Sequence, residues 1–290
     1  MTRSFALLAV FAALSTAACA SSSEETAGSS ANAATVATRG HHDQVVACEK
    51  ANAQAGETAA STMAMVEMEA DFADCLTKAN DAAVPVIESL LEANESGAVG
   101  GVKAALDAVR KSNGTLCEEF DKASQNFGGT LQHVEAAGCA AEREHLLAAI
   151  IDDMVAFEGV EPTYIKDDRA GHAACYKAYD AVDAESTMQM VGVNVDLADC
   201  VRKEMNPLLD AMASTQVEND ASYGPLAAAK TRLTAAVDGQ ISAADGFCGA
   251  IAEAGENGIG TLTRVSSAAC TARVTEAAFT TIKDNSGGEP

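Results

Sequence analysis

The stretch at residues 61–75, "STMAMVEMEADFADC", recurs 125 residues later as "STMQMVGVNVDLADC" at residues 186–200. Nine of the fifteen positions are identical and no gap is needed. Two other segments recur in step, "ACEKA" at Ala47 as "ACYKA" at Ala174, and "GTLQHVEAAGC" at Gly129 as "GTLTRVSSAAC" at Gly260. The chain of 290 residues therefore contains a tandem duplication, with units at residues 44–157 and 173–284 and a linker at residues 158–172.

Apolar residues in both units recur at steps of three and four, which predicts amphipathic helices. In the first unit this stripe comprises Met65, Met68, Phe72, Cys75, Ala79, Ala83, Ile87 and Leu90. A further stripe in the second unit comprises Leu226, Leu233, Val237, Ile241, Ala244, Phe247 and Ile251. Ser61 or Thr62, and the matching Ser186 or Thr187, are expected to cap helix N-termini. Pro85 and Pro207 predict a kink or a break.

The spacing of the cysteines predicts how the helices are joined. Apart from Cys19, each unit has four cysteines, spaced by 27, 42 and 22 residues in the first unit and by 25, 48 and 22 in the second. Each consecutive pair straddles a turn, and residues equidistant from the turn of an antiparallel helix pair stand at the same height. Four cysteines allow three pairings, and the symmetry of the units selects Cys48–Cys75, Cys117–Cys139, Cys175–Cys200 and Cys248–Cys270. The predicted fold class is all-α, with two tandem disulfide-stapled modules, each built of two antiparallel helical hairpins and about four helices.

The first eighteen residues have the features of a signal peptide, because Arg3 precedes "FALLAVFAAL", an apolar run too short to span a bilayer. Residues 16–19 resemble a bacterial lipobox and Cys19 is the unpaired cysteine, so we predict lipidation at Cys19, with simple cleavage before Ser21 as the alternative. Residues 19–43 would form a flexible tether and residues 285–290 a tail. The expected location is the bacterial cell envelope, lipid-anchored at the outer membrane or in the periplasm; the alternative is a secreted or periplasmic soluble protein.

The chain is strongly acidic, with 42 acidic and 19 basic residues and a formal charge of −23. Such a charge repels nucleic acid and anionic lipid and attracts basic partners. We therefore expect a basic protein partner, no nucleic-acid binding, and membrane contact through the lipid anchor only. The first unit has a net charge of −12 (19 acidic, 7 basic) and the second −7 (15 acidic, 8 basic), so charge alone favours the first unit as the stronger binder.

The sequence offers little that predicts catalysis or metal binding. The His41-His42 pair falls in the predicted tether, and His145 lacks the second histidine that a zincin helix requires. Arg143 is expected on a charged helix face, and adjacent acids such as Glu118-Glu119 and Asp152-Asp153 are expected to face water. We predict no catalytic residues, no metal site, no cofactor and no enzymatic activity; the sequence does not identify the partner-binding residues.

Both units resemble the LprI-type lysozyme-inhibitor N-terminal domain family, in two tandem divergent copies. In the first unit the resemblance is carried by Cys48, "TMAMVEMEADFADC", "LCEEFDKASQNFGGT" and Cys139, and in the second by Cys175, "STMQMVGVNVDLADC", "FCGAIAEAGENGIGT" and Cys270. The family usually has a Trp-x-x-Tyr-Arg motif shortly before its third cysteine. Here the corresponding places hold Val109, Ser112 and Asn113, and then Gln240, Ala243 and Ala244.

The resemblance implies a small, helical, exported protein that binds and blocks a lysozyme. The expected function is therefore an acidic envelope lipoprotein that binds another protein and inhibits a lysozyme-like muramidase. The alternative is a structural or apolar-ligand-carrying helical module without inhibitory activity, in which Met63, Met65 and Met68 would line the ligand site. A third alternative is metal scavenging by the acidic face together with His41 and His42.

Overall fold

The computed structural model describes residues 24–124, 127–155, 169–255 and 260–285, with backbone only for residues 24–39. This part of the chain is helical and contains no strand, which confirms the predicted all-α class. The first unit has four helices: α1 (Glu24–Gly56), α2 (Thr62–Ala93), α3 (Val102–Ala123) and α4 (Thr130–Val155). The second unit has α5 (Ala173–Asp180), α6 (Thr187–Glu204), α7 (Asn206–Asn219), the 3-10 turn η1 (Ala221–Tyr223), α8 (Leu226–Ala252) and α9 (Thr261–Asn285).

The repeated Ser-Thr dipeptide marks a helix start in both units. The Ser61 hydroxyl accepts a hydrogen bond from the backbone N–H of Ala64, and the Ser186 hydroxyl accepts one from Gln189. The Gln189 side chain also accepts a hydrogen bond from the backbone N–H of Ser186, which completes a capping box. The serines, rather than the threonines, are therefore the N-caps of α2 and α6.

The two prolines act differently. Pro85 lies inside α2 and does not end it, whereas Pro207 lies in the first turn of α7, just after α6 ends at Glu204. A proline is tolerated in a first helical turn because the N–H groups there have no intrahelical partner. The second unit therefore has two helices where the first has the long helix α2.

The eight cysteines of the two units form four disulfides, which are the pairs that the sequence spacing predicts: Cys48–Cys75, Cys117–Cys139, Cys175–Cys200 and Cys248–Cys270. The Cα–Cα distances lie between 5.7 and 5.9 Å. The bonds join α1 to α2, α3 to α4, α5 to α6, and α8 to α9. Each helical hairpin is thus closed by one covalent link.

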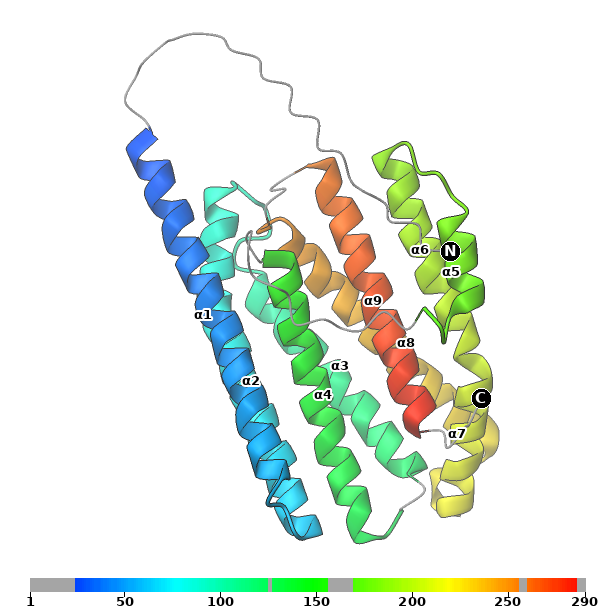
Figure 1. Ribbon diagram of the computed structural model, residues 1–290. Coiled ribbons are helices and arrows are strands. Elements are labelled where there is room, and N and C mark those ends of the chain that lie inside the picture. Colours follow the sequence, from blue (N-terminus) through cyan, green and yellow to red (C-terminus); the bar gives the residue numbers. More distant parts are fainter. Residues whose placement is uncertain (1–23, 125–126, 156–168, 256–259, 286–290) are drawn as a thin grey trace, which may run out of the picture.

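The two units share their hydrophobic core. In one cluster, Leu116 and Phe120 of α3 pack among apolar residues of α6, α7, α8 and α9. In the other, Phe247 and Ile251 of α8 pack among apolar residues of α2, α3 and α4. Figure 1 shows α1 and α2 on one side, α5, α6 and α7 on the other, and the remaining helices between them. Each unit therefore contributes the C-terminal part of its next-to-last helix, α3 or α8, to the core of the other.

A reciprocal pair of hydrogen bonds shows that the units are related by an approximate two-fold axis. The Asn94 side chain at the end of α2 donates to the carbonyl oxygen of Glu253 at 2.8 Å. The Asn219 side chain at the end of α7 donates to the carbonyl oxygen of Lys122 at 3.1 Å. Counted from the repeated cysteines, Asn219 matches Asn94 and Glu253 matches Lys122. The same contact is thus made in both directions, as in a symmetric dimer.

The predicted tether differs most from the structure. Helix α1 begins at Glu24 and includes residues 41–43, which the sequence analysis assigns to a flexible segment. The reason is that His41 is buried against α2 and α4, so this part of the chain packs on the first unit.

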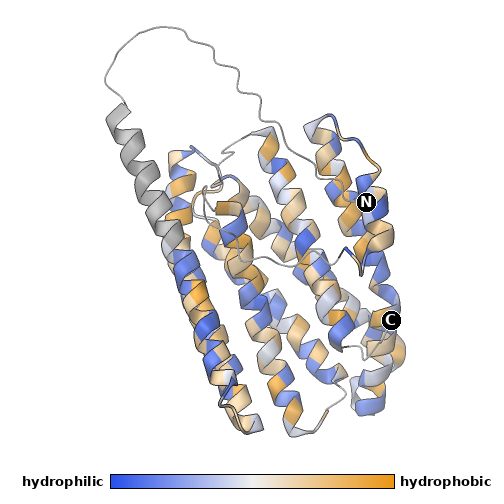
Figure 2. Ribbon diagram, in the orientation of Figure 1, coloured by the Kyte–Doolittle hydropathy of each residue, from blue (hydrophilic) through white to orange (hydrophobic). Residues whose placement is uncertain are grey.

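Hydrophobic and hydrophilic residues are interspersed along the helices (Figure 2). Among the described residues, no helix has a stretch long and apolar enough to cross a membrane.

Candidate functional site

The His41-His42 pair takes part in a polar cluster rather than lying in solvent. The Nδ1 atom of His41 is 2.6 Å from one carboxylate oxygen of Asp152, and the Nδ1 atom of His42 is 2.9 Å from the other. The Nε2 atom of His41 is also 3.2 Å from the side-chain oxygen of Asn80. His41 and Asp152 are both buried. Asp152 therefore joins α4 to α1, and the prediction that it faces water is wrong.

Asn80 extends this cluster to a second group of charges. Its side-chain amide donates to the carboxylate of Glu144 at 3.0 Å. Arg110 of α3 donates to both oxygens of Glu144, at 2.8 and 3.1 Å, and to Asp81 at 2.6 Å. It donates in addition to the carbonyl oxygen of Thr77 at 3.2 Å. A single guanidinium thus links α2, α3 and α4, with the two-pronged geometry that arginine favours on a carboxylate.

The two histidines control the ionisation of Asp152. Burial opposes the charged carboxylate, but hydrogen bonds and positive charge from His41 and His42 outweigh it, so the pKa of Asp152 lies below its usual range. A carboxyl group whose pKa is lower in the folded protein stabilises the fold fully above its unfolded pKa. That contribution is lost as the pH falls through the lower, folded value.

We expect Asp152→Asn to lower the free energy of unfolding at neutral pH by about 1–3 kcal/mol, because two hydrogen bonds to a charged acceptor are weakened. It should also reduce the loss of stability that the wild type shows below about pH 4. Urea denaturation at neutral and acidic pH measures both effects. The control is Asp74→Asn, because Asp74 forms an exposed ion pair with Lys78, worth less than about 1 kcal/mol. Equal stability of the Asp152 and Asp74 variants would contradict this role.

Two further polar residues are buried, contrary to the prediction from sequence. Arg143 is 3% exposed and donates to the Thr281 hydroxyl on α9; burial lowers the pKa of its guanidinium. Glu119 is 6% exposed and accepts hydrogen bonds from Lys122 and from Gln216 of α7. Both residues lie where the two units meet. The pattern of polar residues along one helix cannot predict such a contact, because the helix that buries the residue belongs to the other unit.

Four of the six positions that match the family's Trp-x-x-Tyr-Arg motif are buried, and the other two, Ser112 and Ala243, are half-buried. Val109, Asn113, Gln240 and Ala244 are all buried, on helices α3 and α8. The side-chain amides of Asn113 and Gln240 have no hydrogen-bond partner among the described atoms. In this chain these four positions are therefore covered by other helices and are not available as a contact surface.

Among the described residues, we identify a groove of about 760 Å³ in the second unit as a candidate site. It lies where α6, α8 and α9 meet. Its apolar side chains are Val191, Val195, Ala198, Ile241 and Ala268. Val195 is 47% exposed, so part of this apolar surface faces solvent. We call this feature the α6–α8–α9 groove.

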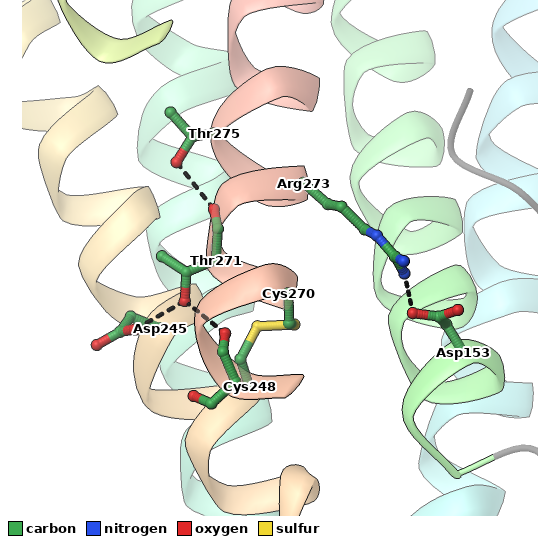
Figure 3. The surroundings of a disulfide bond; sticks show 8 residues. Asp153, Asp245, Cys248, Cys270, Thr271, Arg273 and Thr275 are labelled. Carbon is green, nitrogen blue, oxygen red and sulfur yellow. Dashed lines mark hydrogen bonds and ion pairs between the residues drawn. A yellow bond between two sulfur atoms is a disulfide. The ribbon is translucent and has the colours of Figure 1, made fainter. Parts of the chain in front are cut away.

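Charged and hydroxyl side chains surround the apolar residues of the groove. The acids are Asp199, Asp238, Asp245 and Glu253, and the bases are Arg202 and Arg264. Arg202 donates to Asp238 at 2.7 Å, which neutralises that acid. The Thr271 hydroxyl donates to Asp245 at 2.7 Å, beside the Cys248–Cys270 disulfide (Figure 3). A neutral donor leaves the negative charge of Asp245 uncompensated, so the groove offers an apolar surface with a net negative rim.

Two other expectations concern ligands. Met63 is 67% exposed and Met65 and Met68 are half-buried, so the methionine stripe does not line an enclosed ligand site. Cys175, Cys200 and Glu204 place potential metal ligands close together. However, the two sulfur atoms are joined in a disulfide, and Glu204 lies 2.7 Å from the Nδ1 atom of His172. This group is therefore structural.

Cys19, the predicted lipidation site, lies outside the described residues. The sequence does not identify the partner-binding residues, and the groove is the place where we look for them. The only trace of the groove in the sequence is that the two repeats differ at residues that line it. Comparison of the chain with protein-family models, with curated proteins and with solved structures found no match.

Proposed function

We propose that this protein is an exported, disulfide-stapled binding protein whose partner is a basic protein. The observation that carries the proposal is the charge of −23. Every described α-helix contributes at least one exposed acid to it: Asp43, Asp71, Asp107, Glu142, Asp180, Asp199, Asp210, Asp245 and Asp284. A field of one sign on all sides accelerates encounter with a protein of opposite charge.

The disulfides support an extracellular or periplasmic location. Four such bonds in one chain are typical of oxidising compartments and are rare in the cytosol. We propose in addition that Cys19 carries a lipid that anchors the protein to the envelope. Cys19→Ser should then move the protein from the membrane fraction to the soluble fraction. A wild type that is already soluble, with Ser21 at its N-terminus, would contradict the anchor.

Within the class of basic proteins, a lysozyme-like muramidase is the partner that we propose. This choice rests on the resemblance of the two four-cysteine units to the lysozyme-inhibitor family. Four of the six positions that match the family's motif are buried in this chain, so we propose that the contact surface lies elsewhere on the chain. Inhibition would follow if the bound protein covers the lysozyme cleft, and binding without inhibition would follow if it does not.

The test is a titration of the mature, oxidised chain with hen lysozyme, first at low and then at moderate salt, together with a turbidity assay of lysozyme activity. We expect saturable binding that weakens as salt rises, because exposed charges are screened over about 8 Å at physiological ionic strength. An acidic protein, carbonic anhydrase, serves as the control partner. Absence of lysozyme binding at low salt would overturn the proposal.

A second candidate function is the carriage of an apolar ligand, which the apolar side chains of the α6–α8–α9 groove favour. Its volume of about 760 Å³ lies within the range of small-molecule sites, roughly 300–1,000 Å³. Organic extraction of the purified protein followed by mass spectrometry distinguishes the two functions. A carrier would release a stoichiometric apolar compound and would not inhibit lysozyme.

A further inference from the structure

In the first unit, helices α2, α3 and α4 correspond to α6, α8 and α9 of the second. The space between them is filled by a side chain, so the described residues of these helices leave no such groove. There, Arg110 of α3 extends between α2 and α4 and binds Glu144, Asp81 and the carbonyl oxygen of Thr77. Its side chain is only 18% exposed. The aliphatic part of this arginine occupies the interhelical space, and its guanidinium satisfies the carboxylates at the surface.

The second unit has lost this arrangement. Counted from the repeated cysteines, Ile241 matches Arg110 and Thr275 matches Glu144. Arg202 matches Thr77. All three of these residues line the α6–α8–α9 groove. The groove therefore lies where the first unit is bridged by an internal arginine, and neither Ile241 nor Thr275 can form that bridge.

We propose that the α6–α8–α9 groove binds an arginine- or lysine-bearing segment of the basic partner. The cationic side chain takes the place in the second unit that Arg110 takes in the first. This inference rests on the proposed function and locates it on the chain. It places the contact in the second unit, although the first unit has the more negative charge.

The charges of the groove fit such a segment. Gly114 and Lys122 of the first unit are matched in the second by Asp245 and Glu253, so two positions that carry no acid in the first unit carry one in the second. Asp199 and Asp245 are exposed, whereas Glu253 is half-buried and accepts a hydrogen bond from the Ser96 hydroxyl. The stem of a bound arginine or lysine would contact Val195, Ala198 and Ile241. Its cationic end would form charge-assisted hydrogen bonds with Asp199 or Asp245.

The test closes the groove without changing the net charge of the chain. Ile241→Arg combined with Thr275→Glu reproduces the Arg110–Glu144 pair of the first unit within the second. We expect this double variant to bind hen lysozyme at least about tenfold more weakly than the wild type, a loss typical of a central contact. The matched control is Leu131→Arg with Thr115→Glu, which makes the same charge-neutral exchange at exposed sites of the first unit. It should bind as the wild type does.

A second probe separates this inference from the proposed function. A synthetic amphipathic peptide of leucine and arginine is titrated by fluorescence anisotropy against the wild type, the Ile241→Arg, Thr275→Glu variant and the control variant. The Ile241→Arg, Thr275→Glu variant is called the closed variant. If the closed variant retains full affinity for lysozyme, the groove is not the site, while the proposed function stands. If lysozyme does not bind the wild type but the peptide binds it and not the closed variant, the groove inference stands and the lysozyme proposal fails. Equal peptide binding by the wild type and the closed variant, or none by either, would overturn the groove inference.

Discussion

Replacing Phe247 with alanine is expected to lower the free energy of unfolding by about 3–5 kcal/mol, the usual cost of removing a buried aromatic ring. Phe247 is fully buried in α8, and its cluster includes Leu91, Leu106 and Leu147 of the first unit. The ring thus belongs to the second unit by sequence and to the core of the first by position. Its loss should destabilise both units together.

Differential scanning calorimetry of the oxidised chain measures this effect. We expect one unfolding transition in the wild type and one, at lower temperature, in the Phe247→Ala variant. The control is Leu226→Ala on the same helix. Because Leu226 is half-exposed, its replacement should lower the free energy of unfolding by about 0.5 kcal/mol or less. Two separate transitions, of which only one shifts in the variant, would show that the units fold independently and that the shared core does not couple them.

Removing the Cys248–Cys270 disulfide by a double substitution with alanine is expected to cost about 3 kcal/mol. The bond closes a loop of 22 residues, and the chain-entropy relation gives about that value for such a length. Both cysteines are also buried in the cluster that joins the units, so the substitution leaves space in the core. Urea denaturation of the variant and the wild type measures the difference. A variant as stable as the wild type would show that packing alone holds α8 against α9.

Much of the fold can be predicted from the sequence because its signals are local. The steps of three and four give the helices, Ser61 and Ser186 give two of their starts, and the repeated cysteine spacings give the four disulfides. No local signal shows that the end of α3 packs in the core of the second unit and the end of α8 in the core of the first. The apolar stripe of residues 226–251 predicts that Phe247 is buried, but it does not show which unit buries it.

The polar clusters were missed for a related reason. His41 and Asp152 are 111 residues apart in the chain, and a histidine pair followed by an acid has the composition of a solvated segment. Aligning the repeats sets Arg110 against Ile241 and Glu144 against Thr275, and the structure shows that Arg110 and Glu144 form an ion pair. The loss of both members of a charge pair in one copy predicts either a repacked core or an open space. The structure shows that it is an open space.

Zero-length cross-linking with a carbodiimide can locate the contact with lysozyme, because it joins a carboxyl group of this chain to a lysine amine in contact with it. The complex with hen lysozyme is cross-linked at moderate salt, digested and mapped by mass spectrometry. We predict intermolecular peptides that contain Asp199, Asp245 or Glu253, and their loss in the variant with Ile241→Arg and Thr275→Glu. Cross-links confined to carboxylates of residues 44–157, unchanged in that variant, would contradict this prediction.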